Sequence, residues 1–393
     1  MKLADIEMFE VSLPLRRPHT YASLGAQRLG NYLIIRLNTD KGISGLGEAP
    51  VVPTWGGDHM TYFGESVSTA KVVIHDFLEP AIKGQDPREI SHILELMDRV
   101  IVGYPFAKAA IDMALHDIVG KDLGVPVYQL LGGRYRSNIP LAHSIGLLET
   151  ERAIEEAKVV VGEGIRTVKL KIGQDPQRDL DVVKGVREAI GEKIEITVDA
   201  NEGYKSPKIA IRIIKQMERY GIAIAEQPVK GLEAMARVTE GVDTPIMADE
   251  SAWTPQDVAR IKETRAADII SIYTTKPGGL HNALKVAHVA EAFGFPCNLN
   301  GSIETGVGNA ANVAMAAAAR PITLPCVFPL TTILGKEQTK MAGVYYVDDL
   351  ITEPFSYDNG TVIPSDKPGL GIELDESKLS KYAPSGRNIV NHL

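Results

Sequence analysis

Residues 167–201, which read TVKLKIGQDPQRDLDVVKGVREAIGEKIEITVDAN, contain the pattern that decides the fold. Two short apolar strand candidates, TVKLKIG and IEITVDAN, flank an amphipathic helix candidate that ends at Gly191. The first strand carries Lys169 and Lys171 on the face opposite its apolar residues, because side chains alternate along a strand. An edge strand would leave both lysines in water, whereas a strand buried on both faces would need a reason to hold them.

The same unit repeats from about residue 138 onward. Eight apolar strand candidates alternate with amphipathic helix candidates, which predicts a parallel sheet wrapped by helices. The candidates are IPLAHSIG, TVKLKIG, IEITVDAN, IAIAEQP, PIMADES, DIISIYTTK, PCNLNGS and ITLPCVFP. Eight units match a (β/α)8-type barrel, in which the C-terminal strand ends form the reactive face. Because a closed barrel has no edges, the explanation of the lysines as edge residues loses force.

A polar residue ends each of strands two to six: Lys171, Asp199, Glu226, Asp249 and Tyr273. The three carboxylates should converge at one mouth of the barrel, where they would repel one another without a cation. Hard oxygen ligands gathered in this way suit Mg²⁺. The alternative is that each carboxylate caps the helix that follows it. The need of converging carboxylates for charge compensation favours the metal site.

The two lysines lie on the same side as these carboxylates. Burial and a nearby cation lower a lysine pKa, so one of the pair can be a neutral amine that acts as a base. Lys171, at the mouth, is the better base, and Lys169 lies deeper in the strand. The metal would stabilise the enediolate that forms when the carbon next to a substrate carboxylate loses its proton. The alternative is that both lysines only form structural salt bridges.

The rest of the chain is organised differently. Residues 1–130 read as an α+β domain with antiparallel strands and an alanine-rich helix, AKAAIDMALHDIVGKDLG. Residues 131–340 form the predicted barrel, and the irregular segment 341–393 is expected to return to the first domain.

Composition excludes several classes of function. The chain has 393 residues, 44% of them hydrophobic, enough for a large core in two domains. A net charge of −8 without basic runs argues against a nucleic-acid partner. No segment reads as a signal peptide or membrane span, so we expect a soluble, cytoplasmic protein. Two cysteines give no disulfide framework and no cysteine metal site.

The segments KLKIG, VDANEGY, AEQP and ADES, together with AAIDMALHDIVGKDLGVPVYQLLGG at 109–133, resemble the enolase superfamily over nearly the whole chain. The resemblance implies an N-terminal capping domain completed by the C-terminal segment. It also implies a barrel that carries the acids and bases, with Mg²⁺ on Asp199, Glu226 and Asp249. Loops around residues 19–30 and 50–60 would close over a small carboxylate substrate. Members of the family commonly form homo-oligomers, which we expect here.

The lysine pair and Glu304 of GSIETGVG resemble the muconate lactonizing enzyme subgroup. By resemblance, Lys171 is the acid/base of strand two and Lys169 an electrostatic aid. The chain departs from the subgroup at strand six, where YTTKPGG has Tyr273 in place of the usual second lysine. Lys276, three residues later, is interpreted as a loop residue. Because tyrosine has a pKa near 10, Tyr273 would be a proton donor rather than a base at pH 7.

The absence of a second lysine base favours a lyase or cycloisomerase over a two-base racemase. The favoured reaction is dehydration of a hydroxy acid or hydroxy amino acid, and cyclic substrates are included. In this reaction Lys171 or Tyr273 helps the leaving group depart. The alternatives are an epimerase or racemase of an amino-acid derivative and a non-catalytic metal-binding barrel. Further substrate contacts are expected from Asn201, Glu304, Asn298, Tyr21 and Trp55, and His19 is a weaker candidate.

Overall fold

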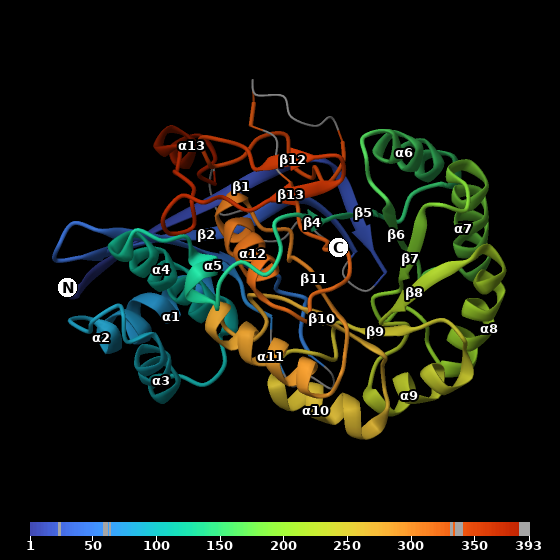
Figure 1. Cartoon of the computed structure of the whole chain (residues 1–393), viewed down its shortest axis with the longest axis horizontal. Helices are drawn as coiled ribbons and strands as arrows, with labels where there is room; N and C mark the ends of the chain where they lie inside the picture. Colours follow the sequence, from blue (N-terminus) through green and yellow to red (C-terminus); the bar gives the residue numbers. More distant parts are fainter. Residues whose placement is uncertain (23–24, 58–61, 63, 331–332, 335–340, 385–393) are drawn as a thin grey trace.

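The computed structural model describes residues 1–22, 25–57, 62, 64–330, 333–334 and 341–384. An antiparallel sheet with its helices lies beside a ring of helices around a parallel sheet (Figure 1). This arrangement confirms the predicted fold class, a modified (β/α)8 barrel with an N-terminal α+β capping domain.

The capping domain is built on the strand order β1-β2-β3, with both pairs antiparallel. Its strands are β1 (Leu3–Tyr21), β2 (Gly25–Thr39) and β3 (Ser44–Pro50). Its helices are α1 (Val67–Val73), the π-helix η2 (Ile74–Leu78), α2 (Glu79–Ile82), α3 (Ile90–Val100), α4 (Pro105–Leu123) and α5 (Val127–Leu130). The predicted antiparallel strands and alanine-rich helix are therefore present, and β1 extends further than the sequence pattern indicated.

Helix α4 lies directly against strand β3. A Cβ atom on Gly45 would come within 2.0 Å of the Ala114 carbonyl oxygen, and one on Gly47 within 1.9 Å of the Ala110 carbonyl oxygen. Only glycine permits this approach of two backbones. The two glycines of DKGISGLGEA thus join the sheet of the capping domain to its longest helix.

Seven parallel strands form the barrel sheet, in the order β11-β10-β9-β8-β7-β6-β5. They are β5 (Ala142–Ile145), β6 (Thr167–Lys171), β7 (Glu195–Asp199), β8 (Ile222–Glu226), β9 (Ile246–Ala248), β10 (Ile269–Ile272) and β11 (Cys297–Leu299). The helices are α6 (Thr150–Gly162), α7 (Pro176–Ile190), α8 (Pro207–Met217), the 3₁₀ turn η3 (Glu218–Tyr220), α9 (Leu232–Gly241), α10 (Pro255–Thr264), α11 (Leu280–Ala292) and α12 (Gly306–Ala318). Strand β6 lies between β5 and β7, so its lysines are not edge residues.

The eighth predicted strand, residues 322–329, does not form a regular strand. It makes isolated parallel bridges instead, through Ile322 and Val327 to the β11 side and through Cys326 to Leu141 beside β5. Proline cannot donate to a strand ladder, and Pro325 and Pro329 interrupt this segment. These bridges connect the two edges of the seven-stranded sheet and close the barrel.

The C-terminal segment contacts both parts of the molecule. Its hairpin, β12 (Ser356–Asp358) and β13 (Thr361–Ile363), pairs with β4 (Ile139–Pro140) at the start of the barrel. The segment also binds β1 through hydrogen bonds from the Arg16 amide to the Tyr345 carbonyl and from the Ser12 amide to the Tyr382 carbonyl, both 2.8 Å. Tyr382 follows the last helix, α13 (Glu376–Lys381).

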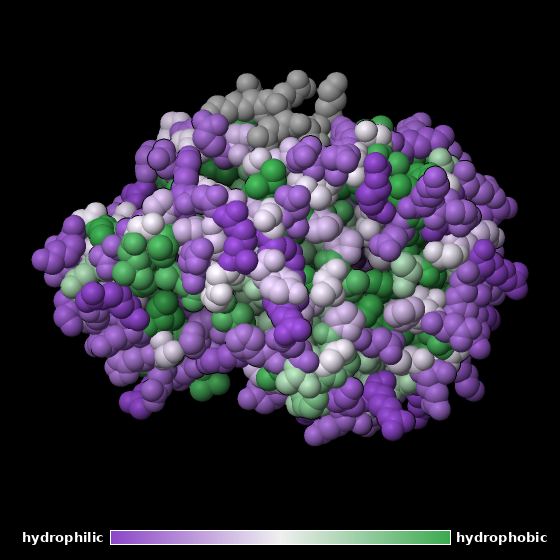
Figure 2. Space-filling view, viewed as in Figure 1, coloured by the Kyte–Doolittle hydropathy of each residue, from purple (hydrophilic) through white to green (hydrophobic). Residues whose placement is uncertain are grey.

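The face of the molecule shown in Figure 2 is mainly polar. Hydrophilic side chains cover the helices at the barrel rim, and apolar side chains are exposed in separate patches on the face shown in Figure 2. Among the described residues, no helix is both long enough and apolar enough to cross a bilayer.

A carboxylate of the capping domain binds the first turn of a barrel helix. Glu48 of β3 is fully buried and accepts hydrogen bonds from the Thr305 amide (2.9 Å), the Thr305 hydroxyl (2.6 Å) and the Gly308 amide (2.8 Å). Thr305 caps the N-terminus of α12. Burial raises the pKa of Glu48 to about 8, despite these donors, and nearby Glu304 contributes in the same direction.

We expect Glu48→Gln to change the pH dependence of stability. A carboxyl whose folded-state pKa is raised stabilises the fold fully below its unfolded pKa, near 4.5, and this contribution is lost as pH rises through about 8. Glutamine cannot titrate, so the variant should lose less stability than the wild type between pH 5 and 8, by a few kcal/mol. Urea unfolding at the two pH values measures this difference. Parallel losses in the two proteins would contradict it.

Candidate active site

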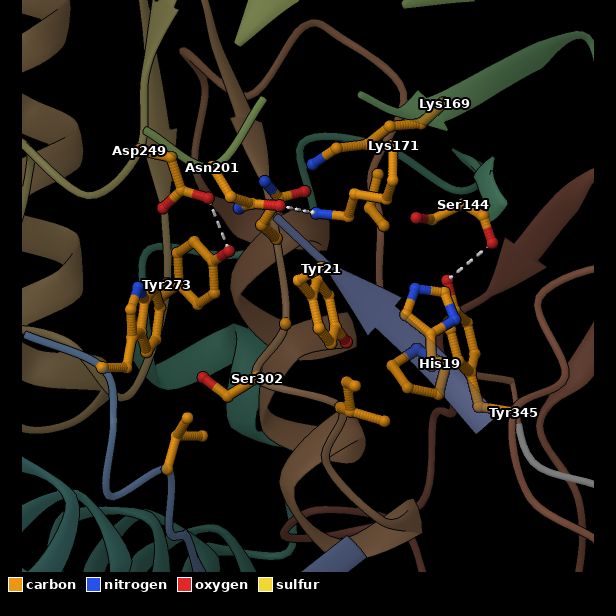
Figure 3. A pocket seen from close by; sticks show the side chains of 17 residues that line it. His19, Tyr21, Ser144, Lys169, Lys171, Asn201, Asp249, Tyr273, Ser302 and Tyr345 are labelled. Carbon is orange, nitrogen blue, oxygen red and sulfur yellow. Dashed lines mark hydrogen bonds between the residues drawn. The ribbon is translucent and has the colours of Figure 1, made fainter. Parts of the chain in front are cut away.

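A compact cavity of about 70 Å³ lies at the mouth of the barrel. Barrel strand ends contribute Ser144, Lys169, Lys171, Asn201, Asp249 and Tyr273, and the capping domain contributes His19, Tyr21, Val52 and Trp55. Figure 3 shows Asp249 and Tyr273 on one side and Ser144, His19 and Tyr345 on the other. The cavity is therefore enclosed by both domains.

The predicted carboxylates and lysines of the strand ends meet in a buried network. Lys169 Nζ lies 2.7 Å from Glu226 Oε1 and 2.9 Å from Asp199 Oδ2. Lys171 Nζ lies 2.6 Å from Asp199 Oδ2 and donates to Asn201 Oδ1 at 2.8 Å.

The sharp turn after β6 depends on Gly173, which has a φ of +104°. Gly173 also lies close to Ala200, because a Cβ atom on Gly173 would meet the Ala200 carbonyl oxygen at 2.5 Å.

Charge crowding shifts the pKa values of this network. Burial would raise the pKa of Asp199, but Lys169 and Lys171 hold it below its usual range. Burial, followed by the charges of Asp199 and Asp249, raises the pKa of Glu226 well above that of a free glutamate. Burial and the neighbouring carboxylates therefore oppose the charged form of Glu226 even beside Lys169.

One lysine of the pair is expected to be a neutral amine, and Lys169 is not that lysine. Burial lowers its pKa, but the charges of Asp199, Glu226 and Asp249 outweigh burial and raise the Lys169 pKa. Lys169 is thus an ammonium in this network, in agreement with an electrostatic rather than a basic role.

The three carboxylates fit Mg²⁺ by their chemistry. No group of three or more His, Cys, Asp and Glu side chains is arranged to hold a metal ion as it stands in the described part of the chain. Each of the three carboxylates instead contacts a lysine: Asp199 and Glu226 contact Lys169, and Asp249 contacts Lys276. They are nevertheless hard oxygen donors at consecutive strand ends, and the crowding of Asp199 and Asp249 around Glu226 is one that a bound cation would relieve.

Tyr273 and Lys276 both bind Asp249. The Tyr273 hydroxyl donates to Asp249 Oδ2 at 2.8 Å, and Lys276 Nζ donates to Asp249 Oδ1 at 2.6 Å and to the Asp249 carbonyl oxygen at 2.7 Å. Lys276 Nζ also lies 4.1 Å from the centre of the Tyr273 ring. Burial and the charge of Asp249 raise the pKa of Tyr273 well above 10.

Lys276 lies in the turn after β10, as predicted, but it is not a surface residue. Only 1% of it is exposed, and its ammonium group belongs to the carboxylate network. The interpretation of Lys276 as a loop residue without a part in the site was therefore incomplete. The short distance in sequence between Lys276 and Tyr273, three residues, was the only hint in the sequence that Lys276 lies near the site.

The predicted substrate contacts divide into two groups. Tyr21, Trp55 and Asn201 line the cavity, and the Tyr21 ring centre lies 4.8 Å from Lys171 Nζ. Asn298 and Glu304 are buried but are not among the residues that line it. Asn298 donates to Asn300 at 3.2 Å. Glu304 faces the capping domain, where burial raises its pKa to about 7.

Sequence reasoning missed Ser144 and Tyr345 as cavity residues, although it named His19. Ser144 is the next-to-last residue of β5, the first barrel strand, so its place near the strand end was a usable signal. Tyr345 lies in the C-terminal segment, whose path cannot be read from periodicity. Of the predicted lid loops, residues 23–24 and 58–61 lie outside the described residues.

A barrel with acids and bases at its strand ends, closed by an α+β domain, defines a class of enzymes. Residues 3–132 match the mandelate racemase/muconate lactonizing enzyme N-terminal domain, and residues 152–378 match the enolase C-terminal domain-like family. The chain therefore belongs to the enolase superfamily and is similar to its muconate lactonizing enzymes.

Three similar proteins illustrate the range of the family. The chain is 35% identical to the N-succinyl-L-Arg/Lys racemase of Bacillus cereus, over 97% of this chain and 98% of the relative. It is 34% identical to muconate cycloisomerase 1 of Rhodococcus opacus, with the same two coverages. The structure of the dipeptide epimerase of Enterococcus faecalis, complexed with Mg and the dipeptide L-Leu-L-Tyr, has a TM-score of 0.83 and 30% identity, covering 95% of this chain and 99% of that chain.

Proposed function

We propose that this enzyme removes the proton next to the carboxylate of a small substrate with a single base, Lys171, and then eliminates water. The observation that supports a single base is the hydrogen bond from the Tyr273 hydroxyl to Asp249 Oδ2 at 2.8 Å. Tyr273 occupies the side of the cavity where a second base would act, and a tyrosine with its proton in place is not a base.

Each step follows from atoms in the cavity. Lys171 Nζ takes the α-proton, and the electron pair of that C–H bond forms a double bond to the β-carbon. The β-carbon loses its bond to a hydroxyl group, which accepts a proton from the Lys171 ammonium and leaves as water. Lys169, held between Asp199 and Glu226, supplies a fixed positive charge close to the reacting carbon.

Asp199, Glu226 and Asp249 would hold a Mg²⁺ ion. When bound, the ion supplies positive charge beside the substrate carboxylate, where negative charge develops as the α-proton leaves. The aromatic side chains of Tyr21 and Trp55 line the same cavity and exclude water from it.

A second candidate, an epimerase of an amino-acid derivative, is favoured by the names of similar proteins, among them a racemase and a dipeptide epimerase. These names favour epimerisation over the elimination of water. An epimerase needs proton transfer on both faces of the substrate, and Tyr273, in the cavity wall, is the candidate for the second transfer. Lys276 is not among the residues that line the cavity.

We expect Tyr273→Phe to separate these two functions. With substrate in D₂O, the variant should still introduce deuterium at the α-position at a rate within a few-fold of wild type, because Lys171 remains. Mass spectrometry of the recovered substrate measures the exchange. Tyr204→Phe is the matched control, since it removes another hydrogen bond from tyrosine to aspartate, 3.1 Å to Asp179 Oδ2, away from the cavity.

Two outcomes would favour the epimerase instead. In the first, Tyr273→Phe stops exchange from one stereoisomer while Tyr204→Phe does not. In the second, wild type exchanges both stereoisomers at similar rates. Either result would show that Tyr273 or another group acts on the face opposite Lys171.

A further inference from the structure

The Ser144 hydroxyl is a buried polar group without a partner. Ser144 is 3% exposed, and its Oγ forms no hydrogen bond among the described residues. A buried hydroxyl that lacks a hydrogen bond is costly, so its position in the wall of the cavity indicates a partner brought by the substrate. The Ser144 carbonyl oxygen is already bound by the Tyr345 hydroxyl at 3.3 Å, which holds the residue in place.

Ser144 stands beside the proposed base. It is the ladder partner of Lys169 on the neighbouring strand, and Lys171 follows two residues later on the same face of β6. Adjacent strands lie about 4.8 Å apart, so a substrate that presents its α-carbon to Lys171 brings its next atoms close to Ser144.

His19 also lines the cavity, on the same side as Ser144. Its ring lies against the rings of Tyr21 (4.8 Å between centres) and Tyr345 (5.1 Å), and it is only 2% exposed. Figure 3 shows His19 and Ser144 on the same side of the cavity. Burial, followed by the charges of Arg17 and Lys171, lowers the pKa of His19, so the ring is neutral.

A neutral imidazole and a serine hydroxyl can each donate and accept a hydrogen bond. Together they suit a neutral hydroxyl group, because a hydroxyl group can also donate and accept. They suit a second carboxylate less well, because a carboxylate only accepts. The cavity of about 70 Å³ leaves room for a compact substrate.

We infer that His19 and Ser144 bind a hydroxyl group on the carbon next to the one that loses its proton, so that the substrates are small 3-hydroxy carboxylic acids or 3-hydroxy amino acids. This inference rests on the proposed function. In this position the hydroxyl lies on the Lys171 side of the substrate. The Lys171 ammonium can then return the proton it has taken as the C–O bond breaks, and water is released.

Paired substrates test the subsite. The rate of α-proton loss in D₂O, by exchange or elimination, is measured for threonine and 2-aminobutyrate and for 3-hydroxyproline and proline. Wild type should act faster on the hydroxylated member of at least one pair. Ser144→Ala should lower kcat/KM for that member by roughly 3- to 10-fold, the value of one neutral hydrogen bond, and leave the deoxy member unchanged. His19→Phe should lower it similarly while preserving the ring contacts.

Ser302→Ala is the matched control. Ser302 also lines the cavity, but its hydroxyl already has a partner, the Thr275 hydroxyl at 3.2 Å. This variant should affect both members of a pair equally, and thermal melting checks that all three variants fold. Equal effects of Ser144→Ala and His19→Phe on both members would overturn the subsite and leave the proposed function standing. No α-proton loss from any of the four compounds with wild type would overturn both.

Discussion

Replacement of Lys171 by alanine is expected to abolish α-proton exchange. The proposed mechanism has one base, and a positioned general base speeds a reaction on the order of 10²- to 10⁴-fold. The exchange rate should therefore fall by a factor of at least about 100. The rate of deuterium incorporation in D₂O measures the effect directly, without a requirement for product formation.

Lys171→Arg distinguishes the base from the ion pair. Lys171 Nζ also neutralises Asp199 at 2.6 Å, and alanine removes both roles at once. Arginine keeps a positive charge beside Asp199 but cannot lose its proton at the pH of the assay. It should therefore be as inactive as alanine. Exchange near the wild-type rate in the arginine variant would mean that Lys171 acts only through its charge and that another group is the base.

Asp249→Ala should weaken Mg²⁺ binding about 100-fold or more, because the loss of an outer partner of a metal ligand alone typically costs about 10- to 100-fold. Isothermal titration calorimetry of the variant and wild type measures this affinity without substrate. The reason for the expected effect is the position of Asp249 at the end of β9, next to the strand ends that carry Glu226 and Asp199.

Asp179→Asn is the control for a general effect of removing a buried carboxylate. Asp179 lies on α7, is buried, and accepts a hydrogen bond from the Gly173 amide at 2.8 Å rather than joining the strand-end network. Its replacement should leave Mg²⁺ affinity unchanged. Equal affinity in wild type and Asp249→Ala would remove the basis for the metal site, and a large loss in Asp179→Asn would make the loss in Asp249→Ala uninformative about ligation.

Much of the barrel could be predicted because its strands obey a simple rule. Each of strands β6 to β10 has a short apolar run with a polar residue at or directly after its end, and the position of that residue gives its place at the mouth. The eighth segment broke the rule, because Pro325 and Pro329 remove backbone donors and leave isolated bridges in place of a ladder. The apolar composition of this segment still predicted its place between the two edges of the sheet. It did not predict that the backbone would form isolated bridges.

The site residues that could not be predicted depend on contacts between distant segments. Lys276 reaches Asp249 only because the turn after β10 folds back over Tyr273, and a run of letters does not reveal that path. Tyr345 reaches the cavity because residues beyond the barrel bind β1. Glu304 is a buried acid that is not among the residues lining the cavity, and its charge helps to raise the pKa of Glu48 of the capping domain.

The hydrogen bonds between β1 and the C-terminal segment join residues that are far apart in the sequence. The Ser12 amide binds the Tyr382 carbonyl, and Leu15 bridges to Tyr346, so β1 contacts residues that lie more than 300 positions later in the chain. Contacts of such sequence separation form slowly and leave apolar strands exposed meanwhile. A chain that stops before Tyr345 therefore lacks one residue of the cavity wall.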